Sequence, residues 1–332
     1  MNVKELIRTI NHTLKSHNLF PENSRILVAC SGGPDSMALL YLLQDIATHR
    51  HTTYKIGVAI VDHCIRPESK DEVLWLQHQV EELGLPFYSA TFDVPRLSKE
   101  YKKSEETIGR QVRYQWLNEI AQSEGYDYIS VAHHKDDQAE SILAHIIRGS
   151  GLNGLTGMSV VQSEYAIPVV RPLLDVTKEN LLAYIGIKQI SYCVDSTNDD
   201  VRYQRNRIRH RIIPELEAVN PAVVDAIVRL GSSVNEDVMV ISDLTARTFD
   251  KLVSIGDDEV SISRRALRQE PLAIQRRLWQ RLVSTIDPDL MLTSAHQEQL
   301  LDIVNTGEKK TFTIKSIKVI AQCDTIKVYC KH

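Results

Sequence analysis

The stretch ILVACSGGPDSMALLYLL at residues 26–43 decides the fold of this chain. Small and β-branched apolar residues at 26–30 predict a buried strand, and residues 37–43 predict the apolar start of a helix. The polar turn SGGPDS at 31–36 joins the two. A polar turn between a buried strand and a helix is suited to holding a phosphate group.

The turn contains the groups that an anion site needs. Gly32 and Gly33 let the backbone approach an anion without a Cβ in the way, and the following helix offers unpaired N–H groups. Ser31 and Ser36 add hydroxyl donors. Asp35 has the wrong charge for a bare phosphate, so we expect Mg²⁺ between its carboxylate and the phosphates of a nucleotide.

Other types of glycine-containing turn could also join a strand to a helix. The turn lacks the Gly-Lys-Ser/Thr of a Walker A loop and the GxGxxG of a dinucleotide turn. An ordinary turn with a serine helix cap would explain the same residues without a ligand. The pattern Ser-Gly-Gly-x-Asp-Ser resembles the PP-loop of the ATP pyrophosphatases, which cleave ATP between its α and β phosphates. This resemblance implies ATP as the nucleotide.

The composition excludes several classes of protein. A chain of 332 residues with 43% hydrophobic content is long enough for roughly two domains with their own cores. The 25% charged fraction and the lack of a long apolar run exclude a membrane span and a disordered chain. Charges interrupt the amphipathic residues 1–17, so we expect no secretory signal and a cytoplasmic protein. Five scattered cysteines without a C-x-x-C pair predict reduced thiols and no structural zinc.

Strands and helices alternate over roughly the first 150 residues, which predicts an α/β fold with a parallel, doubly wound sheet covered by helices on both faces. Ligands bind such sheets at the carboxyl ends of strands. The segments expected to form further strands are 54–61, 86–92 and 128–132, and those expected to form helices are 68–83, 104–123 and a segment ending near residue 148.

Each polar cluster of this region follows a predicted strand. The clusters are the turn at 31–36, the pair Asp62 and His63, and residues 133–137. We therefore expect one crevice to collect all three.

The pattern changes near residue 220, where we predict a domain boundary. Before it, the glycine-rich residues 149–157 predict a loop or hinge. After it, long helical segments precede residues 311–328, which alternate like short antiparallel strands. We predict a nucleotide-binding catalytic domain at 1–219 and a smaller, mainly helical domain at 220–332 that ends in short strands.

Residues 133–141, HHKDDQAES, place Asp137 and Glu140 on one face of a helix. The cluster of histidines and carboxylates admits a metal site, part of a nucleotide site or a solvated charged face. Its position after the fourth strand favours a role in the crevice.

Arginines gather in three places. Glu106, Arg110 and Arg113 share a helix face, either as a surface ion pair or to neutralise a departing pyrophosphate. Residues 202–211 hold five arginines, which are either solvated or in contact with phosphates of ATP or RNA. Arg276 and Arg277 belong to a further cluster, and in a chain of net charge −4 such clusters predict a partitioned surface.

Six segments, taken together and in order, resemble the bacterial tRNA(Ile)-lysidine synthetase family. Gly109 and Ser141 depart from the more usual Ala and Thr, and the C-terminal part resembles the family only loosely. The segments are SGGPDS at 31–36, VDHCIRPES at 61–69, EETIGRQVRY at 105–114, AHHKDDQAES at 132–141, RGSGLNGLTGM at 148–158, and DSTND at 195–199 with YQRNRIRHRIIPEL at 203–216.

The resemblance implies that the ε-amine of free L-lysine replaces the 2-oxo group of the wobble cytidine in the CAU anticodon of tRNA(Ile). ATP with Mg²⁺ would first adenylate that oxygen, because a pyrimidine carbonyl oxygen is otherwise a poor leaving group. The partners are then tRNA(Ile), lysine and ATP, with no membrane and a homodimer as one possible assembly.

The resemblance also implies roles for individual residues. The base that deprotonates lysine would be His133, and Asp137 and Glu140 would steer the amine. The implied catalytic residues are Asp35, Arg113, His133, Asp137, Glu140 and Arg205. The implied ATP-binding residues are Ser31, Gly32, Gly33, Pro34, Asp35, Ser36, Asp62, His63, Arg110 and Arg113. The implied tRNA-binding residues are Arg202, Arg207, Arg209, Arg276 and Arg277, and the implied metal ligands are Asp35 and Asp137.

Two other functions compete with this one. A PP-loop tRNA thiolation enzyme would also adenylate a base carbonyl, although such enzymes generally use sulfur-handling cysteines, and no two cysteines here are closely spaced. A non-catalytic nucleotide-binding module would need only the loop and would leave residues 133–140 unexplained.

Overall fold

The computed structural model describes residues 2–66, 68–193, 204–256, 259–288, 290–306 and 309–330. The chain forms two compact units, Met1–Ser233 and Val234–His332, and the division falls within helix α11 (Val223–Leu252). Among the described residues, no helix combines the length and apolar character needed to cross a membrane.

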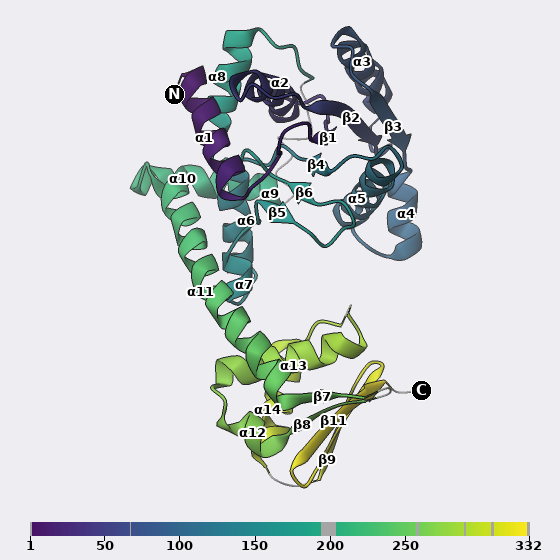
Figure 1. The fold of residues 1–332 in the computed structure, drawn as a ribbon, viewed down its shortest axis with the longest axis vertical. Coiled ribbons are helices and arrows are strands. Elements are labelled where there is room, and N and C mark those ends of the chain that lie inside the picture. Colours follow the sequence, from purple (N-terminus) through teal and green to yellow (C-terminus); the bar gives the residue numbers. More distant parts are fainter. Residues whose placement is uncertain are drawn as a thin grey trace. The chain divides into compact units, whose positions relative to one another are not determined.

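The first unit is built on a six-stranded sheet with strand order β3-β2-β1-β4-β6-β5 (Figure 1). All neighbours pair in parallel except β5, which is antiparallel to β6. This confirms the predicted parallel sheet and its first four strands. The strands are β1 Arg25–Ala29, β2 Lys55–Asp62, β3 Phe87–Thr91, β4 Tyr128–Ser130, β5 Val161–Gln162 and β6 Val169–Val170.

Helices connect these strands, and those at 34–49, 69–82, 105–123 and 135–147 confirm the predicted helical segments. Helices α4 and α7 were not predicted: the Asp93 side chain caps α4 by accepting a hydrogen bond from the backbone N–H of Arg96, and α7 lies within residues 149–157, which were expected to form a loop or hinge. The helices of this unit, besides the start of α11, are α1 Val3–Ser16, α2 Pro34–His49, α3 Ser69–Glu82, α4 Val94–Tyr101, α5 Glu105–Ser123, α6 Lys135–Ile147, α7 Leu152–Leu155, α8 Lys178–Lys188, α9 Gln204–Arg207, the π-helix η2 Ile208–Ile212 and α10 Ile213–Val219.

Strand β1 is buried on both faces, as its unbroken apolar run predicts. Ile26 and Val28 belong to a core that includes α2, whereas Leu27 belongs to a second core with Leu117 of α5. Successive side chains of a strand point to opposite faces, so helices must cover both sides of the sheet.

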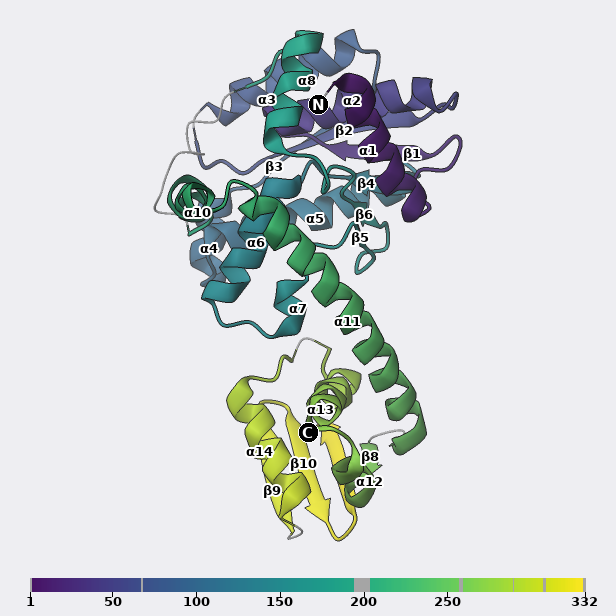
Figure 2. The ribbon, with the colours of Figure 1, turned by 90° about the vertical axis from the view of Figure 1, so that its left-hand side faces the viewer.

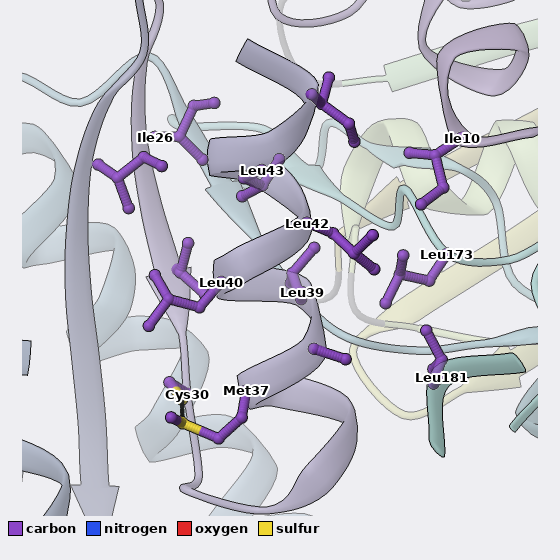
Figure 3. Close-up of a cluster of buried hydrophobic side chains, with 14 of the residues drawn as sticks. Ile10, Ile26, Cys30, Met37, Leu39, Leu40, Leu42, Leu43, Leu173 and Leu181 are labelled. Carbon is purple, nitrogen blue, oxygen red and sulfur yellow. Dashed lines mark hydrogen bonds between the residues drawn. The ribbon is translucent and has the colours of Figure 1, made fainter. Parts of the chain in front are cut away.

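Helix α2 is itself buried on two sides (Figure 3). Met37 and Leu40 lie toward β1, while Leu39 and Leu42 lie toward Leu173 and the helices α1 and α8. This packing fixes α2, and so it fixes the loop at the start of α2.

The second unit contains a five-stranded antiparallel sheet with the order β7-β8-β11-β10-β9, and helices α12, α13 and α14 accompany it (Figure 2). Its core includes Leu267, Trp279 and Leu300, one from each helix, and the alternate residues Val319 and Ala321 of β10. Strands β7 and β8 were not predicted. The elements are β7 Val253–Ile255, β8 Glu259–Ser263, α12 Arg264–Gln269, α13 Leu272–Ile286, α14 Ser294–Asn305, β9 Lys310–Ile314, β10 Ile317–Gln322 and β11 Thr325–Cys330.

Candidate active site

The glycine loop is closed by its own hydrogen bonds. The Ser36 hydroxyl donates to the Gly33 carbonyl at 2.9 Å and accepts from the Ser31 backbone N–H at 3.2 Å. Gly32 has φ +77°, a conformation that favours glycine. Gly33 is the N-cap of α2 and provides no side-chain hydrogen bond, so α2 directs N–H groups without a side-chain cap toward the loop.

A cavity of about 710 Å³ opens beside this loop. The ends of β1 and β2 and the residues that follow β4 contribute to its wall, and residues of all three polar clusters that we expected in one crevice line it, with His133 representing the cluster at 133–137. The predicted site residues that line it are Ser31, Gly33, Pro34, Asp35, Ser36, Asp62, His63, Arg113, His133 and Arg209.

Other predicted site residues do not line this cavity. Gly32 lies within the loop itself, and Arg276 and Arg277 belong to α13 of the second unit. Arg202 and the segment 195–200 lie outside the described residues. The remaining ones, all in the first unit, are Arg110, Asp137, Glu140, Arg205 and Arg207.

Asp35 is paired with a lysine that was not predicted from the sequence. Lys178 Nζ donates to both carboxylate oxygens of Asp35, at 2.6 and 2.7 Å. Lys178 lines the cavity and is the first residue of α8. The same rule that singled out the other clusters could have found it, because α8 follows the short strand β6.

His134 connects Asp35 to the carboxylates of α6. Its Nδ1 lies 3.3 Å from Asp136 Oδ2 and its Nε2 lies 3.4 Å from Asp137 Oδ2. Burial alone would lower the pKa of His134, but the Asp136 hydrogen bond and the negative charges of Asp137 and Asp35 raise it above its usual value.

Asp137 and Glu140 hold two arginines. Arg205 donates to Glu140 Oε2 and to Asp137 Oδ1, both at 2.8 Å. Arg209 donates to Glu140 Oε1 at 2.6 Å and to Asp137 Oδ1 at 3.0 Å. Glu140 is 1% exposed and Asp137 is 7% exposed. Burial would lower the pKa of Arg205 and of Arg209, but the two carboxylates raise it.

The ion pairs of Asp137 and Glu140 with the two arginines limit the roles predicted for these residues. Both carboxylates are neutralised by guanidinium groups, and Arg209 lines the cavity whereas the carboxylates do not. Lysine steering by Asp137 and Glu140 and a phosphate role for Arg205 remain proposals that must accommodate these ion pairs.

Arg113 differs from Arg205 and Arg209 in its surroundings. It lines the cavity, and among the described residues it forms no ion pair with a carboxylate. Its guanidinium carbon lies 5.2 Å from the ring centre of Tyr114, and that of Arg110 lies 4.8 Å from the same centre. Burial lowers the pKa of Arg113, as does the charge of Arg110. An arginine without a carboxylate at a cavity wall is suited to an anion.

Two histidines near Arg113 stay neutral. Burial and the charge of Arg113 lower the pKa of His63 to about 4. Burial lowers the pKa of His133 to about 3, against the opposing charge of Asp137. The buried Nδ1 atoms of both rings lack a hydrogen-bond partner among the described residues.

The carboxylates at the cavity wall suit Mg²⁺ only if oxygen atoms of a substrate complete its coordination. No group of three or more His, Cys, Asp or Glu side chains in the described ranges is arranged to hold a metal ion. Asp35 and Asp62 present hard carboxylate oxygens at the cavity wall, which suits an ion completed by phosphate oxygens. Asp137 fits poorly, because Arg205, Arg209 and the His134 backbone N–H occupy its oxygens.

A parallel sheet with a glycine loop after its first strand, beside a cavity whose wall includes Arg113, defines a nucleotide-binding α/β protein. Residues 3–216 match the family model of the PP-loop domain. The chain belongs to the PP-loop domain family, and its glycine loop is an ATP-binding PP-loop.

Three similar curated proteins carry the same name. A tRNA(Ile)-lysidine synthase of Thermosipho africanus is 37% identical over 74% of this chain and 56% of its own length. One of Porphyromonas gingivalis is 35% identical over 68% of this chain and 48% of its length. One of Caldanaerobacter subterraneus subsp. tengcongensis is 29% identical over 98% of this chain and 68% of its length. The chain thus spans about half the length of the first two relatives.

A solved structure shares the fold. The U34-tRNA thiolase NcsA from Methanococcus maripaludis superposes with a TM-score of 0.59 over 70% of this chain and 78% of its own, at 20% identity.

Proposed function

We propose that this chain joins the ε-amine of L-lysine to carbon 2 of the wobble cytidine of tRNA(Ile) with a CAU anticodon, and converts ATP to AMP and pyrophosphate. The observation that carries the proposal is that motifs resembling those of lysidine synthetases line one cavity next to the PP-loop. The names of the curated relatives support the same activity.

The cavity offers the groups that adenylation requires. The PP-loop and the N-terminus of α2 bind the phosphates, and Arg113 offsets the charge that develops as pyrophosphate leaves. Asp35, helped by Asp62, would hold Mg²⁺, which when bound neutralises phosphate charge. Adenylation makes the 2-oxo oxygen part of a good leaving group, so the ε-amine of lysine forms a bond to carbon 2 while the bond between carbon 2 and that oxygen breaks, and the oxygen leaves as part of AMP.

The charge pattern around α6 supports an amino-acid site. A free amino acid carries an α-ammonium and an α-carboxylate, and the cluster of Asp137, Glu140, Arg205 and Arg209 contains a partner for each. The α-ammonium and α-carboxylate of lysine would replace partners in the existing ion pairs. The ε-amine then stays free to act as the nucleophile. The low pKa of His133 keeps this ring neutral and able to accept a proton, but only transiently.

The RNA-binding surface is proposed from exposed arginines. Arg207 and Arg276 are exposed and available to phosphates. Arg277 is partly exposed and donates to the Ala273 carbonyl. Arg209 is held by Glu140, so its contribution to RNA binding requires release from that pair.

Purified protein with ATP, radiolabelled lysine and tRNA(Ile) transcript tests the proposal. We expect label in the tRNA together with equal amounts of AMP and pyrophosphate. Release of ADP and phosphate would contradict cleavage between the α and β phosphates, and incorporation of sulfur from a sulfide donor would favour the thiolation alternative. Asp35→Ala should abolish product without loss of helical circular dichroism, because Asp35 is a partly exposed cavity residue and not part of a core.

A further inference from the structure

The salt bridge between Lys178 and Asp35 joins the segments that follow β6 and β1, two strands that β4 separates in the sheet. Lys178 Nζ lies within hydrogen-bond distance of both Asp35 oxygens, and the side chains are 34% and 28% exposed. Both residues line the cavity beside the PP-loop. The lysine therefore faces the region that the phosphates of ATP would occupy.

The backbone of Lys178 is firmly anchored. Its N–H donates to Asp136 Oδ2 at 2.8 Å, and the Thr177 side chain caps α8 by accepting from the Asn180 N–H. The chain just before it is bonded to the start of α6, where the Lys135 N–H donates to the Val176 carbonyl at 2.8 Å. A fixed backbone with a flexible four-carbon side chain allows the ammonium to change partners while the wall stays in place.

The two possible partners differ in charge. Asp35 carries one negative charge, and a partly exposed ion pair with it is weak. A nucleoside triphosphate carries several negative charges, which attract an ammonium group more strongly than one carboxylate does. Without Lys178, the Asp35 carboxylate would also repel the incoming phosphates.

We propose that Lys178 is a phosphate-binding residue, which neutralises Asp35 in the free protein and transfers its ammonium to the β or γ phosphate of bound ATP. This inference rests on the proposed binding of ATP at the PP-loop. It adds to the site a residue of α8, which lies beyond the loop and the segments that carry the resemblance.

The test is calorimetric titration of the full chain with α,β-methylene ATP and, separately, with AMP. We expect Lys178→Met to weaken binding of the triphosphate analogue by about tenfold to a hundredfold, and binding of AMP by less than about twofold. Lys178→Arg, which keeps the positive charge, should restore most of the affinity for the analogue.

A matched control lies at the other end of the same helix. Lys188 forms an ion pair with Asp45 at 2.8 Å and is 39% exposed, but it does not line the cavity. Lys188→Met should leave both affinities unchanged, and the melting temperatures of both variants show whether the fold is kept.

The outcomes separate this inference from the function on which it rests. If the wild-type chain fails to bind the analogue, the proposed function fails. If the wild type binds but Lys178→Met retains its affinity, Lys178 is not a phosphate ligand. An equal loss of affinity for the analogue and for AMP would also overturn the inference, since it would mean that Lys178 only keeps Asp35 and the loop in place.

Discussion

Replacing Glu140 with glutamine removes the most buried charge of the cluster on α6. Glu140 is 1% exposed and accepts three hydrogen bonds from two arginines, at 2.8 Å from Arg205 Nε and at 2.6 and 3.1 Å from Arg209 Nε and Nη2. After Glu140→Gln, Asp137 alone would face both guanidinium groups. A neutral amide also places an N–H donor next to other donors.

The expected cost follows from burial. Breaking a buried ion pair by removing one partner costs about 3 to 5 kcal/mol. Arg205 and Arg209 are 43% and 35% exposed, so water solvates part of their charge, and we expect a smaller loss of about 2 to 3 kcal/mol. For a unit of this size, that corresponds to a melting temperature lower by roughly 5 to 10 °C.

Differential scanning calorimetry of the full chain measures this shift. Asp225→Asn is a suitable control, because Asp225 pairs with Lys135 at 3.0 Å in the same unit but is 51% exposed, so its loss should cost at most about 1 kcal/mol. Equal effects of the two substitutions would refute the reasoning and would mean that Glu140 does not hold the arginines in solution.

The same variant tests the proposed amino-acid site. Assayed well below its melting temperature, Glu140→Gln should raise the KM for lysine more than the KM for ATP, because the carboxylate lies in the mixed-charge cluster and not at the PP-loop wall. Equal changes in both would place Glu140 outside the lysine site.

Three further predictions concern other parts of the chain. Arg113→Ala should slow pyrophosphate release about 10²- to 10³-fold, and a change of less than about threefold in a radiometric pyrophosphate assay would exclude a role in the transition state. His63 and His133 together should lower the stability by about 3 kcal/mol as pH drops from roughly 6.5 to 5, because the unfolded chain protonates these histidines first, given their folded pKa values of about 4 and about 3. Urea unfolding at the two pH values measures this, and His133→Asn should reduce the difference. Neutralising Arg276 and Arg277 together should weaken tRNA binding and leave ATP binding unchanged. The slope of log affinity against log salt concentration should flatten by somewhat under one unit for each phosphate contact that is lost. An unchanged slope would mean that this cluster is a solvated helix face.

The loop, the first four strands and the longer helices between them could be predicted because each depends on residues close together in sequence. The turn at 31–36 contains both the glycines that its backbone needs and the polar groups of the site. The carboxyl-end rule then brought Asp62 and His133 to the same cavity as Asp35. The rule needs only the order of strands and helices, which hydrophobic periodicity supplies.

Interactions over long sequence separations could not be predicted. Arg205 and Glu140 are 65 residues apart, and Lys178 and Asp35 are 143 residues apart. Composition indicated that acidic and basic clusters exist but not which members pair. Strands β7 and β8 were missed for a related reason, because each is short and gains its stability from pairing within the sheet that β11 completes.

The ion pairs also change how the acidic residues of α6 are interpreted. From the sequence, Asp137 and Glu140 look like an open site for one cation, since the arginines that pair with them lie 65 to 72 residues away in the chain. In the fold, two arginines already balance the two carboxylates, and Arg209 contributes to the cavity wall in front of them. A simple ammonium ion would gain little by displacing a guanidinium that makes several hydrogen bonds. A zwitterionic amino acid can exchange both charges at once, because its carboxylate replaces the acidic partner that an arginine loses. The cluster therefore favours a free amino acid over an isolated amine.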